Sequence, residues 1–390
     1  MEINLPKFTF WKGLFVIILL AGFYSTVVRF TRGLGGSTHL TDAFPWGLWI
    51  GFDVLCGVML AAGAFTLTAV VHIFNIERFK PIVRPTVLTA FLGYLLVVVA
   101  LLFDLGRSYR IWHPLIMWNP RSVMFEVGWC VMLYTTVLAL EFAPIVFERL
   151  RLERPQRILR GISIPLVIAG VILSTLHQSS LGSLYLIVPN KLHPLWYTPL
   201  LPMFFFISAI AIGLAMTIFE SSMSSKYFGK QLELPLLQDL GRILVVVLSV
   251  YFVLRVQDLY HRGVLHLAFN KGYETNLFLI EMVLGLMLPI ALLLNPRVRE
   301  TAGGLYLSAV LVVLGFITNR LNVSITGMEA SAGLRYIPKW TEVAITASII
   351  ATGFAIFALA TKYLPIFEGE RERPAPPKPT MVAELTHART

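Results

Sequence analysis

Ionisable side chains recur inside the most apolar stretches of this sequence. Asp53, Asp104, Glu126 and His177 each fall within or at the end of a long run of apolar residues. An ionised side chain costs about 2.5 kcal/mol or more at the centre of a bilayer, so such residues usually face a protein interior or a water-filled cavity. Carboxylates and an imidazole with pKa values moved by burial can donate and accept protons. These residue types therefore indicate proton transfer within or at a membrane.

The elements that position these residues are predicted to be membrane-spanning helices. The chain has 390 residues, of which 56% are hydrophobic and 14% are charged, whereas soluble domains average about 25% charged residues. Apolar stretches of about 18 or more residues recur, and each can cross a hydrocarbon layer of ~30 Å as a helix. We predict an all-α integral membrane protein whose first stretch is a retained helix, because it ends in Arg29 and Arg32 without a small-residue cleavage site. The ten predicted spans are 13–28, 45–74, 85–104, 123–147, 162–186, 196–221, 240–259, 275–294, 303–323 and 341–364.

The distribution of basic residues predicts the orientation of these helices. Of the 32 Lys and Arg residues, 20 fall on the side that holds both termini and 12 fall on the other side. The positive-inside rule then places both termini in the cytoplasm. Six tryptophans near predicted outer ends support the same orientation, because amphipathic rings favour the headgroup boundary. They are Trp46, Trp49, Trp112, Trp118, Trp196 and Trp340.

Four of the ionisable residues are predicted to lie at one level near the outer ends of spans two to five. At ~1.5 Å of rise per residue, Asp53 lies about 12 Å from the outer end of its span, and Asp104 lies at the outer end of span three. Glu126 follows the entry into span four, and His177 lies about 24 Å from the cytoplasmic end of span five. Each residue alone could make a structural hydrogen bond or ion pair, as we expect for Asp104 with Arg107. The shared depth favours a functional site.

Such a site matches the needs of quinone chemistry. Two electrons transferred to a quinone ring must be matched by two protons at its oxygens. We predict that His177 contacts a quinone oxygen directly and that Glu126 and Asp53 relay protons. Neighbouring polar groups, among them Gln178 and Ser179, add hydrogen-bonding capacity beside the imidazole. The predicted catalytic set is His177, Glu126, Asp53 and Asp104.

A second set of buried charges lies at scattered depths. These residues could form a proton path, or they could be paired charges that hold helices together, and the sequence favours the structural interpretation. The candidate path residues are Glu141, Glu220, Asp258, Glu281 and Arg320.

The sequence predicts that this chain holds no metal, iron–sulfur cluster or haem of its own. Cys56 and Cys130 lie inside apolar spans, without the spacing that clusters or zinc require. Haem ligation by two histidines needs two imidazoles at one depth on facing helices. His72 and His177 are predicted at opposite ends of their spans, and the other histidines lie in loops or the tail.

The residues resemble the NrfD/PsrC superfamily and, within it, the HybB-type membrane subunits of respiratory nickel–iron hydrogenases. The resemblance extends over nearly the whole chain and weakens after span seven. The segments that carry it are FPWGLWIGFD at 44–53, VRP at 83–85, GY at 93–94, DLGR at 104–107, SVMFE at 122–126, LEFAP at 140–144, HQSSLGS at 177–183 and HPLW at 193–196.

The resemblance implies a domain organisation and a set of functional positions. It implies two four-helix bundles with flanking helices, no haem, and a quinone site in the first bundle towards the outer face. The implied quinone or proton-path positions are Asp53, Tyr94, Asp104, Glu126, His177 and Glu220, and we place Tyr94, Arg107, Gln178 and Ser179 in the quinone pocket or on the path to it. The predicted domains are 1–44 (N-terminal helix and outer loop), 45–190 (first bundle, with the quinone site), 191–330 (second bundle), 331–366 (C-terminal helix) and 367–390 (disordered cytoplasmic tail).

The leading functional hypothesis is a quinone-reducing subunit of a hydrogen:quinone oxidoreductase in the bacterial inner membrane, without activity on hydrogen by itself. The resemblance implies menaquinone as acceptor, a ferredoxin-like iron–sulfur subunit and the nickel–iron hydrogenase small and large subunits as partners, and no nucleic acid. Proton translocation coupled to this anaerobic electron transport is a further expectation. One alternative keeps the role but has a molybdenum enzyme or multihaem cytochrome as partner, and another is a secondary ion or solute transporter.

Overall fold

All of the regular secondary structure described for this protein is helical. The computed structural model describes residues 10–73, 76–229 and 232–367, and no strand occurs among them. Ten helical segments in these ranges are long and apolar enough to cross a membrane, which confirms the predicted number of spans. A helix satisfies its backbone hydrogen bonds internally, as hydrocarbon requires. The spans are Phe10–Ser37, Trp49–Ile73, Lys80–Asp104, Val123–Leu150, Ser163–Ile187, Leu201–Tyr227, Leu234–His261, Tyr273–Leu294, Ala302–Ala332 and Trp340–Tyr363.

Six spans are formed by single α-helices, and a seventh is extended by a short 3₁₀ turn. The single helices are α1 (Phe10–Ser37), α4 (Lys80–Asp104), α5 (Val123–Leu150), α8 (Leu201–Phe228), α9 (Leu234–His261) and α15 (Trp340–Tyr363). The extended span is α7 (Ser163–Ser183) followed by η6 (Leu184–Ile187).

The other three spans contain π-helical turns, which often occur at functional sites. The second span joins η1 (Trp49–Cys56), α2 (Gly57–Leu60), α3 (Gly63–Thr68) and η2 (Ala69–Ile73). The eighth joins α10 (Tyr273–Met282), η8 (Val283–Met287) and α11 (Leu288–Leu294), and the ninth joins α13 (Ala302–Leu321), η9 (Asn322–Thr326) and α14 (Gly327–Ala332). Asp53 lies in the π-helical turn η1.

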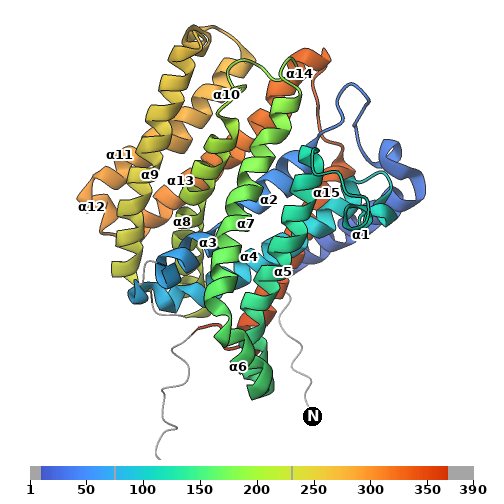
Figure 1. The fold of residues 1–390 in the computed structure, drawn as a ribbon. Helices are drawn as coiled ribbons and strands as arrows, with labels where there is room; N and C mark the ends of the chain where they lie inside the picture. The colour runs from blue at the N-terminus through green and yellow to red at the C-terminus, as the bar shows by residue number, and fades with distance from the viewer. Residues whose placement is uncertain (1–9, 74–75, 230–231, 368–390) are drawn as a thin grey trace, which may run out of the picture.

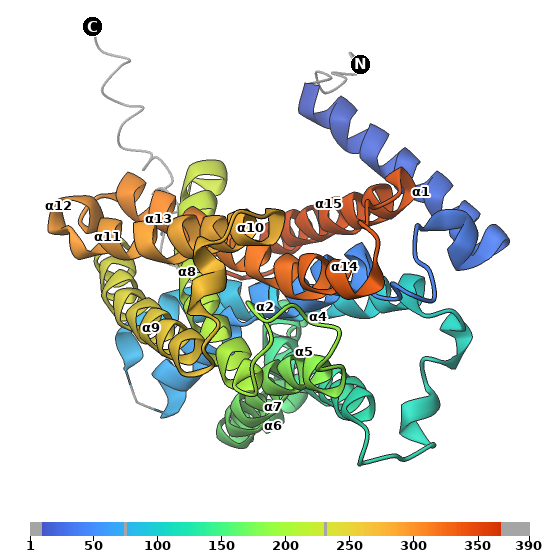
Figure 2. The same cartoon turned by 90° about the horizontal axis from the view of Figure 1, so that it is seen from above.

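The spans surround two central helical segments. Figure 1 shows α14 at one end of the molecule and α6 (Glu153–Gly161) at the other, and we call these the α14 end and the α6 end. Seen from above, α1 and α15 lie at one edge, and α9, α11 and α13 lie at the opposite edge (Figure 2). The span Trp49–Ile73 and α8 are the most enclosed. In each span, the share of buried residues within an apolar stretch of 18 residues is 71% for Trp49–Ile73 and 67% for α8, against 22% for α1 and α15.

Helix α8 joins the earlier spans to the later ones. It packs against α7, α2 and α3 on one side and against α9 and α13 on the other. Helix α7 also packs against α5, and α4 contacts η1, α5 and α15. The division into two four-helix bundles remains a prediction.

A glycine pair allows the closest approach of two helices. A Cβ atom added to Gly315 of α13 would lie 2.0 Å from the Cα atom of Gly285 in η8. Small residues let membrane helices pack backbone against backbone. This contact brings the middle of the eighth span directly onto α13, next to the polar residues described below.

Two of the six tryptophans expected at the membrane interface lie in the interior instead. Trp49 and Trp196 are buried, and their indole N–H groups donate to the Glu342 carbonyl at 3.3 Å and to the Glu281 carboxylate at 3.0 Å. Trp112, Trp118 and Trp340, in contrast, are about half exposed or more, whereas Trp46 is partly buried. The interfacial assignment is therefore wrong for Trp49 and Trp196, whose polar edges are used inside the protein.

The α6 end carries ion pairs and a helix that the sequence pattern did not reveal. The segment 153–161 lies between the predicted spans 123–147 and 162–186, and it forms α6. Glu148 pairs with Arg84 at 3.4 Å and with Arg160 at 3.8 Å. Asp239 pairs with two further arginines, Arg78 and Arg242.

The predicted disordered tail lies outside the described residues apart from its first residue, Phe367.

Candidate functional site

His177 is fully buried on α7 and uses one of its two ring nitrogens. Its Nδ1 atom lies 2.9 Å from the hydroxyl oxygen of Tyr94 on α4, which fixes the orientation of the ring. Its Nε2 atom is buried and has no hydrogen-bond partner. Buried polar atoms in proteins are nearly always paired, so an exception points to a functional role. We call His177, Tyr94, Gln178, Ser180 and Glu126 the His177 group.

Gln178 provides a second unpaired polar atom beside His177. Its amide nitrogen donates to the Val58 carbonyl at 3.2 Å, whereas its Oε1 atom is buried without a partner. Ser179 differs, because its hydroxyl donates to the Thr175 carbonyl of the preceding helical turn at 2.9 Å. Of these two predicted pocket residues, Gln178 therefore has the free acceptor.

Glu126 links the interior to the outer surface of the helices. It lies in the first turn of α5, where a negative charge is favoured by the helix dipole. Its Oε1 atom accepts a hydrogen bond of 2.5 Å from the Ser180 hydroxyl, one helical turn from His177. Glu126 itself is exposed on the surface of the protein. The Glu126 carboxylate therefore lies at the protein surface and is also hydrogen-bonded to a buried member of the His177 group.

Asp53 and Asp104 form a different group, towards α15 and α1. Asp53 is buried and accepts a hydrogen bond of 2.8 Å from Thr346 of α15, and it is close enough to Asp104 to interact electrostatically. Arg29 of α1 donates to the carbonyls of Phe103 and Leu105 at 2.6 and 2.8 Å, at the end of α4.

The expected ion pair between Asp104 and Arg107 does not form, so that prediction is wrong. Helix α4 ends at Asp104, and the backbone is extended at Leu105 and non-helical at Arg107. The helical geometry that would bring residues three apart together is therefore absent. Arg107 is exposed, and no ion pair involves it among the described residues.

The four predicted catalytic residues therefore divide into two groups. Tyr94 precedes Asp104 by ten residues on α4, which corresponds to about 15 Å along the helix. Because His177 is bonded to Tyr94, its ring lies deeper in the protein than Asp104. The structure brings His177 together with Tyr94 and brings Glu126 to the neighbouring turn of α7, but it turns Asp53 towards α15.

Replacing Tyr94 by phenylalanine tests whether this hydroxyl holds the imidazole. The change removes one hydrogen bond, of about 1 kcal/mol, and keeps the packing against Tyr134. We expect the rate of the reaction at His177 to fall roughly fivefold, with little loss of folded protein. Steady-state turnover and thermal unfolding of the same preparation measure both effects, and a fall in stability alone would contradict the prediction.

Three of the candidate path residues in the later spans lie in saturated polar networks. Glu281 accepts hydrogen bonds from Trp196 at 3.0 Å, Asn319 at 2.7 Å and Asn322 at 3.0 Å. Arg320 donates to Asn319 at 2.9 Å and to the Ser208 hydroxyl at 2.6 Å. We call these residues the Glu281 network. It ties α8, α10, α13 and η9 together.

Asp258 is satisfied in a similar way. It accepts hydrogen bonds from Thr198 at 2.7 Å and from Arg262 at 2.8 and 3.0 Å, and Arg255 lies 3.9 Å from it. These partners leave Asp258 in the role of a structural counter-charge. The sequence had favoured this interpretation for the later spans as a set.

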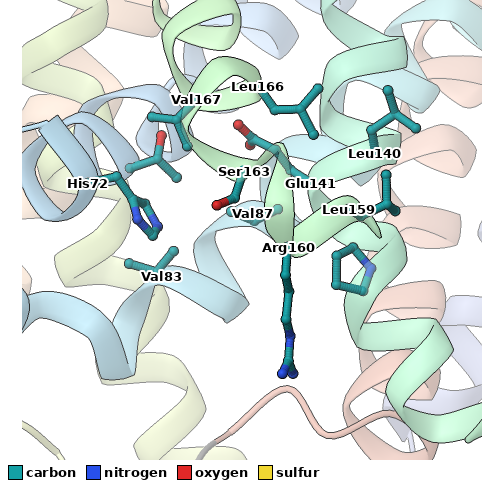
Figure 3. Close-up of a pocket in the computed structure, with 12 residues that line it drawn as sticks. His72, Val83, Val87, Leu140, Glu141, Leu159, Arg160, Ser163, Leu166 and Val167 are labelled. Atoms are coloured by element: carbon teal, nitrogen blue, oxygen red, sulfur yellow. The ribbon is translucent and has the colours of Figure 1, made fainter. Parts of the chain in front are cut away.

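Glu141 and Glu220 differ from these residues. Glu220 has a buried Oε1 atom without a hydrogen-bond partner and lies near Thr89 of α4. Glu141 makes no hydrogen bond or ion pair among the described residues, and it lines a cavity of about 110 Å³ at the α6 end. Figure 3 shows this cavity, with Glu141 and Ser163 near its centre, His72 on one side and Arg160 extending away.

Two residues that the sequence analysis did not select belong beside this cavity and His177. The Tyr134 hydroxyl and the Ser174 hydroxyl are buried without hydrogen-bond partners. Both had a sequence signal, because Tyr134 precedes Glu141 by seven residues and Ser174 precedes His177 by three, which places each on the same face of its helix.

The described histidines do not fit haem ligation by two imidazoles. His72 lines the cavity at the α6 end together with Val167, and His177 lies ten residues further along α7, about 15 Å away. The Nδ1 atom of His177 is already engaged by Tyr94. Among the described residues there is also no group of three or more His, Cys, Asp or Glu residues that could hold a metal ion.

Comparison with known proteins identifies the family. The family model described as polysulphide reductase, NrfD, matches residues 36–332. A protein of Nitratidesulfovibrio vulgaris is 40% identical over 90% of this chain and 92% of its own length. The probable Ni/Fe-hydrogenase 2 b-type cytochrome subunit of Escherichia coli is 34% identical over 87% of this chain and 88% of its own length. The menaquinone reductase integral membrane subunit of N. vulgaris is 28% identical over 95% and 94% of the two chains. The expected resemblance is thus confirmed, and the chain belongs to the NrfD family of membrane proteins.

Proposed function

We propose that this protein is the quinone-reactive membrane subunit of an oxidoreductase complex and passes electrons from an iron–sulfur partner to menaquinone. Relatives named as a hydrogenase subunit and as a menaquinone reductase subunit support a redox role over the secondary-transporter hypothesis. The partner favoured by the hydrogenase relative is a ferredoxin-like iron–sulfur subunit with a nickel–iron hydrogenase. Purification of the complex identifies the partner, and a molybdenum enzyme or multihaem cytochrome would favour the alternative complex.

The observation that carries the proposal is the unpaired Nε2 atom of His177. Tyr94 holds the ring through Nδ1, so Nε2 is free to donate a hydrogen bond to a quinone oxygen. Such a bond stabilises the negative charge that develops on this oxygen as electrons arrive. The unpaired Oε1 atom of Gln178 offers a second contact, to a quinol hydroxyl.

Reduction of the quinone needs two electrons and two protons. The electrons come from the iron–sulfur partner, and one O–H bond forms at each quinone oxygen. Glu126 is suited to a relay because it is exposed and hydrogen-bonded to Ser180, one turn from His177. Leu176, whose carbonyl accepts from the Ser180 hydroxyl, is exposed, which suits an approach of the quinone from the lipid beside α7.

We further propose a location in the bacterial inner membrane with both termini in the cytoplasm. The arginine-rich α6 and the ion-paired residues around Glu148 then face the cytoplasm. In this orientation the α14 end faces the periplasm, and a partner there reaches the His177 group from outside the cytoplasm.

Replacing Glu126 by glutamine tests the proposal. The amide still accepts a hydrogen bond from Ser180 but cannot carry a proton, so we expect menaquinone reduction to fall roughly tenfold. Reduction of a water-soluble dye by the same complex should keep its rate, because the dye takes electrons before the quinone. Equal menaquinone turnover in the variant and the parent would remove Glu126 from the proposed relay, and a parent complex that reduces the dye but not menaquinone would overturn the function.

A further inference from the structure

We propose that one of the two protons for the reaction at His177 enters from the α6 end, through a row of polar groups between α5 and α7 that begins at Glu141. This inference rests on the proposed function and adds the side of the membrane from which protons are taken. We call Glu141, Tyr134, Ser174 and His177 the polar row.

The row begins at the cavity at the α6 end. The cavity has a volume of about 110 Å³, and Glu141, Ser163, His72 and Arg160 contribute its polar lining (Figure 3). Pro144 lies inside α5 and lacks the N–H that would bond the carbonyl four residues earlier, so the Leu140 carbonyl is also available there. A cavity of this volume has room for water beside the Glu141 carboxyl group.

The helix register aligns the row along the interface of α5 and α7. Tyr134 and Glu141 are seven residues apart and share one face of α5, and Ser174 and His177 share one face of α7. Gly170 of α7 leaves space between these faces. A Cβ atom added to Gly170 would lie 3.3 Å from the Glu141 Oε1 atom and 3.7 Å from Cε2 of Tyr134.

The upper members of the row have polar atoms without protein partners. The Tyr134 hydroxyl, the Ser174 hydroxyl and the His177 Nε2 atom are all buried and make no hydrogen bond. Buried polar groups of this kind are commonly bridged by ordered water, and a chain of such bridges conducts protons. The Tyr134 ring also packs edge-on against Tyr94, with centroids 4.7 Å apart, so the row contacts the residue that holds His177.

The hydrogen bonding of Glu141 distinguishes it from the saturated carboxylates. Glu281 and Asp258 each accept hydrogen bonds from several protein donors, which hold these carboxylates in place between helices. Glu141 makes no such bond among the described residues, and Arg160 in the same cavity is paired with Glu148 instead. Glu141 is therefore free to change its protonation state in each cycle.

The transfer is balanced by the quinone reaction. The O–H bond of protonated Glu141 breaks, and each water or hydroxyl of the row takes up a proton on one side and releases its own on the other. The N–H bond at Nε2 of His177 then breaks as an O–H bond forms on the quinone oxygen, and the ring regains its proton from the row. Water in the cavity then returns a proton to the Glu141 carboxylate. One such transfer, together with the proton that Glu126 relays, accompanies the two electrons that the iron–sulfur partner supplies. Electrons from the α14 end and protons from the α6 end together move charge across the membrane.

The experiment uses the purified complex in proteoliposomes, with Glu141→Gln and the matched control Glu153→Gln. Glu153 is an exposed residue of α6 outside the row. We expect Glu141→Gln to lower menaquinone reduction roughly tenfold or more and to abolish the membrane potential formed during turnover, reported by a voltage-sensitive dye. Reduction of a water-soluble dye should stay unchanged, and Glu153→Gln should match the parent in all three measurements.

The outcomes separate this inference from the proposed function. A parent complex that does not reduce menaquinone refutes the function itself. A parent that reduces menaquinone, together with a Glu141→Gln variant that keeps both rate and membrane potential, overturns the inference alone. If Glu141→Gln does not fold, Tyr134→Phe removes a single unpaired hydroxyl, and unchanged turnover and membrane potential in that variant overturn the inference as well.

Discussion

Replacing His177 by alanine should lower menaquinone reduction roughly 100-fold or more, the usual effect of removing a group that transfers or positions a proton at the reacting atom. The change removes the only ring nitrogen of His177 that is free to contact a quinone oxygen, and it also strands the hydroxyl of Tyr94. Electron delivery to a water-soluble dye should continue at the parental rate, because the dye takes electrons from the partner subunit before they reach this site.

The comparison needs a control on the same helix. Thr175 lies two residues from His177 on α7, and its hydroxyl donates to the Val171 carbonyl at 2.7 Å within the helix. Thr175→Ala should therefore keep menaquinone turnover. Binding of a fluorescent quinone analogue, measured by the quenching of its fluorescence, should weaken in His177→Ala and not in the control. A folded His177→Ala protein with parental menaquinone turnover would remove His177 from the site.

The number and type of the elements could be predicted because they depend on local composition. Each span is long and apolar enough to be recognised from its own residues, and all ten appear in the described structure. Residues four and seven apart on one helix share a face, so the alignment of Tyr134 with Glu141 was also open to prediction. Helix α6 was missed because it is polar and short, and apolar periodicity does not mark it.

The grouping of the site residues could not be predicted, because depth along a helix says nothing about the direction of a side chain. Asp53 and His177 were expected at one level in a single site, but Asp53 is bonded to Thr346, a residue nearly 300 positions away in sequence. Trp196 was expected at the membrane interface because it lies near the outer end of a predicted span, yet its indole N–H donates to Glu281 in the interior. Such partners depend on how distant helices pack.

The end of α4 shows a second limit, where a local rule failed. Asp104 and Arg107 have the spacing of an ion pair on a helix, but the helix stops at Asp104. Arg29 from α1 instead donates to carbonyl groups at this end, where a positive charge is favoured by the helix dipole. A charge pair read from sequence therefore requires that the helix continue through both residues.

The hydrogen bonding of the buried polar groups distinguishes the polar row from the Glu281 network. In the polar row, His177, Tyr134 and Ser174 keep polar atoms without partners, which suits a substrate and moving protons. In the later spans, Glu281 is surrounded by donors that it satisfies. A saturated network fixes the relative positions of its helices, because each group left unpaired in a low-dielectric interior is costly. The Glu281 network should therefore govern stability rather than proton transfer.

Replacing Glu281 by leucine should destabilise the protein by about 3 kcal/mol or more, because it leaves the donors of Trp196, Asn319 and Asn322 buried without an acceptor. The matched control is Glu300→Leu, at an exposed carboxylate beyond α12 (Pro296–Arg299), which should change stability by less than about 0.5 kcal/mol. Thermal unfolding of the detergent-solubilised protein measures both changes in stability.

If Glu281 were instead part of a proton path, Glu281→Gln would keep the stability of the parent protein and lose the membrane potential formed during turnover. Because an amide in place of Glu281 cannot accept from all three donors at once, we expect Glu281→Gln to lose stability as well, by less than Glu281→Leu.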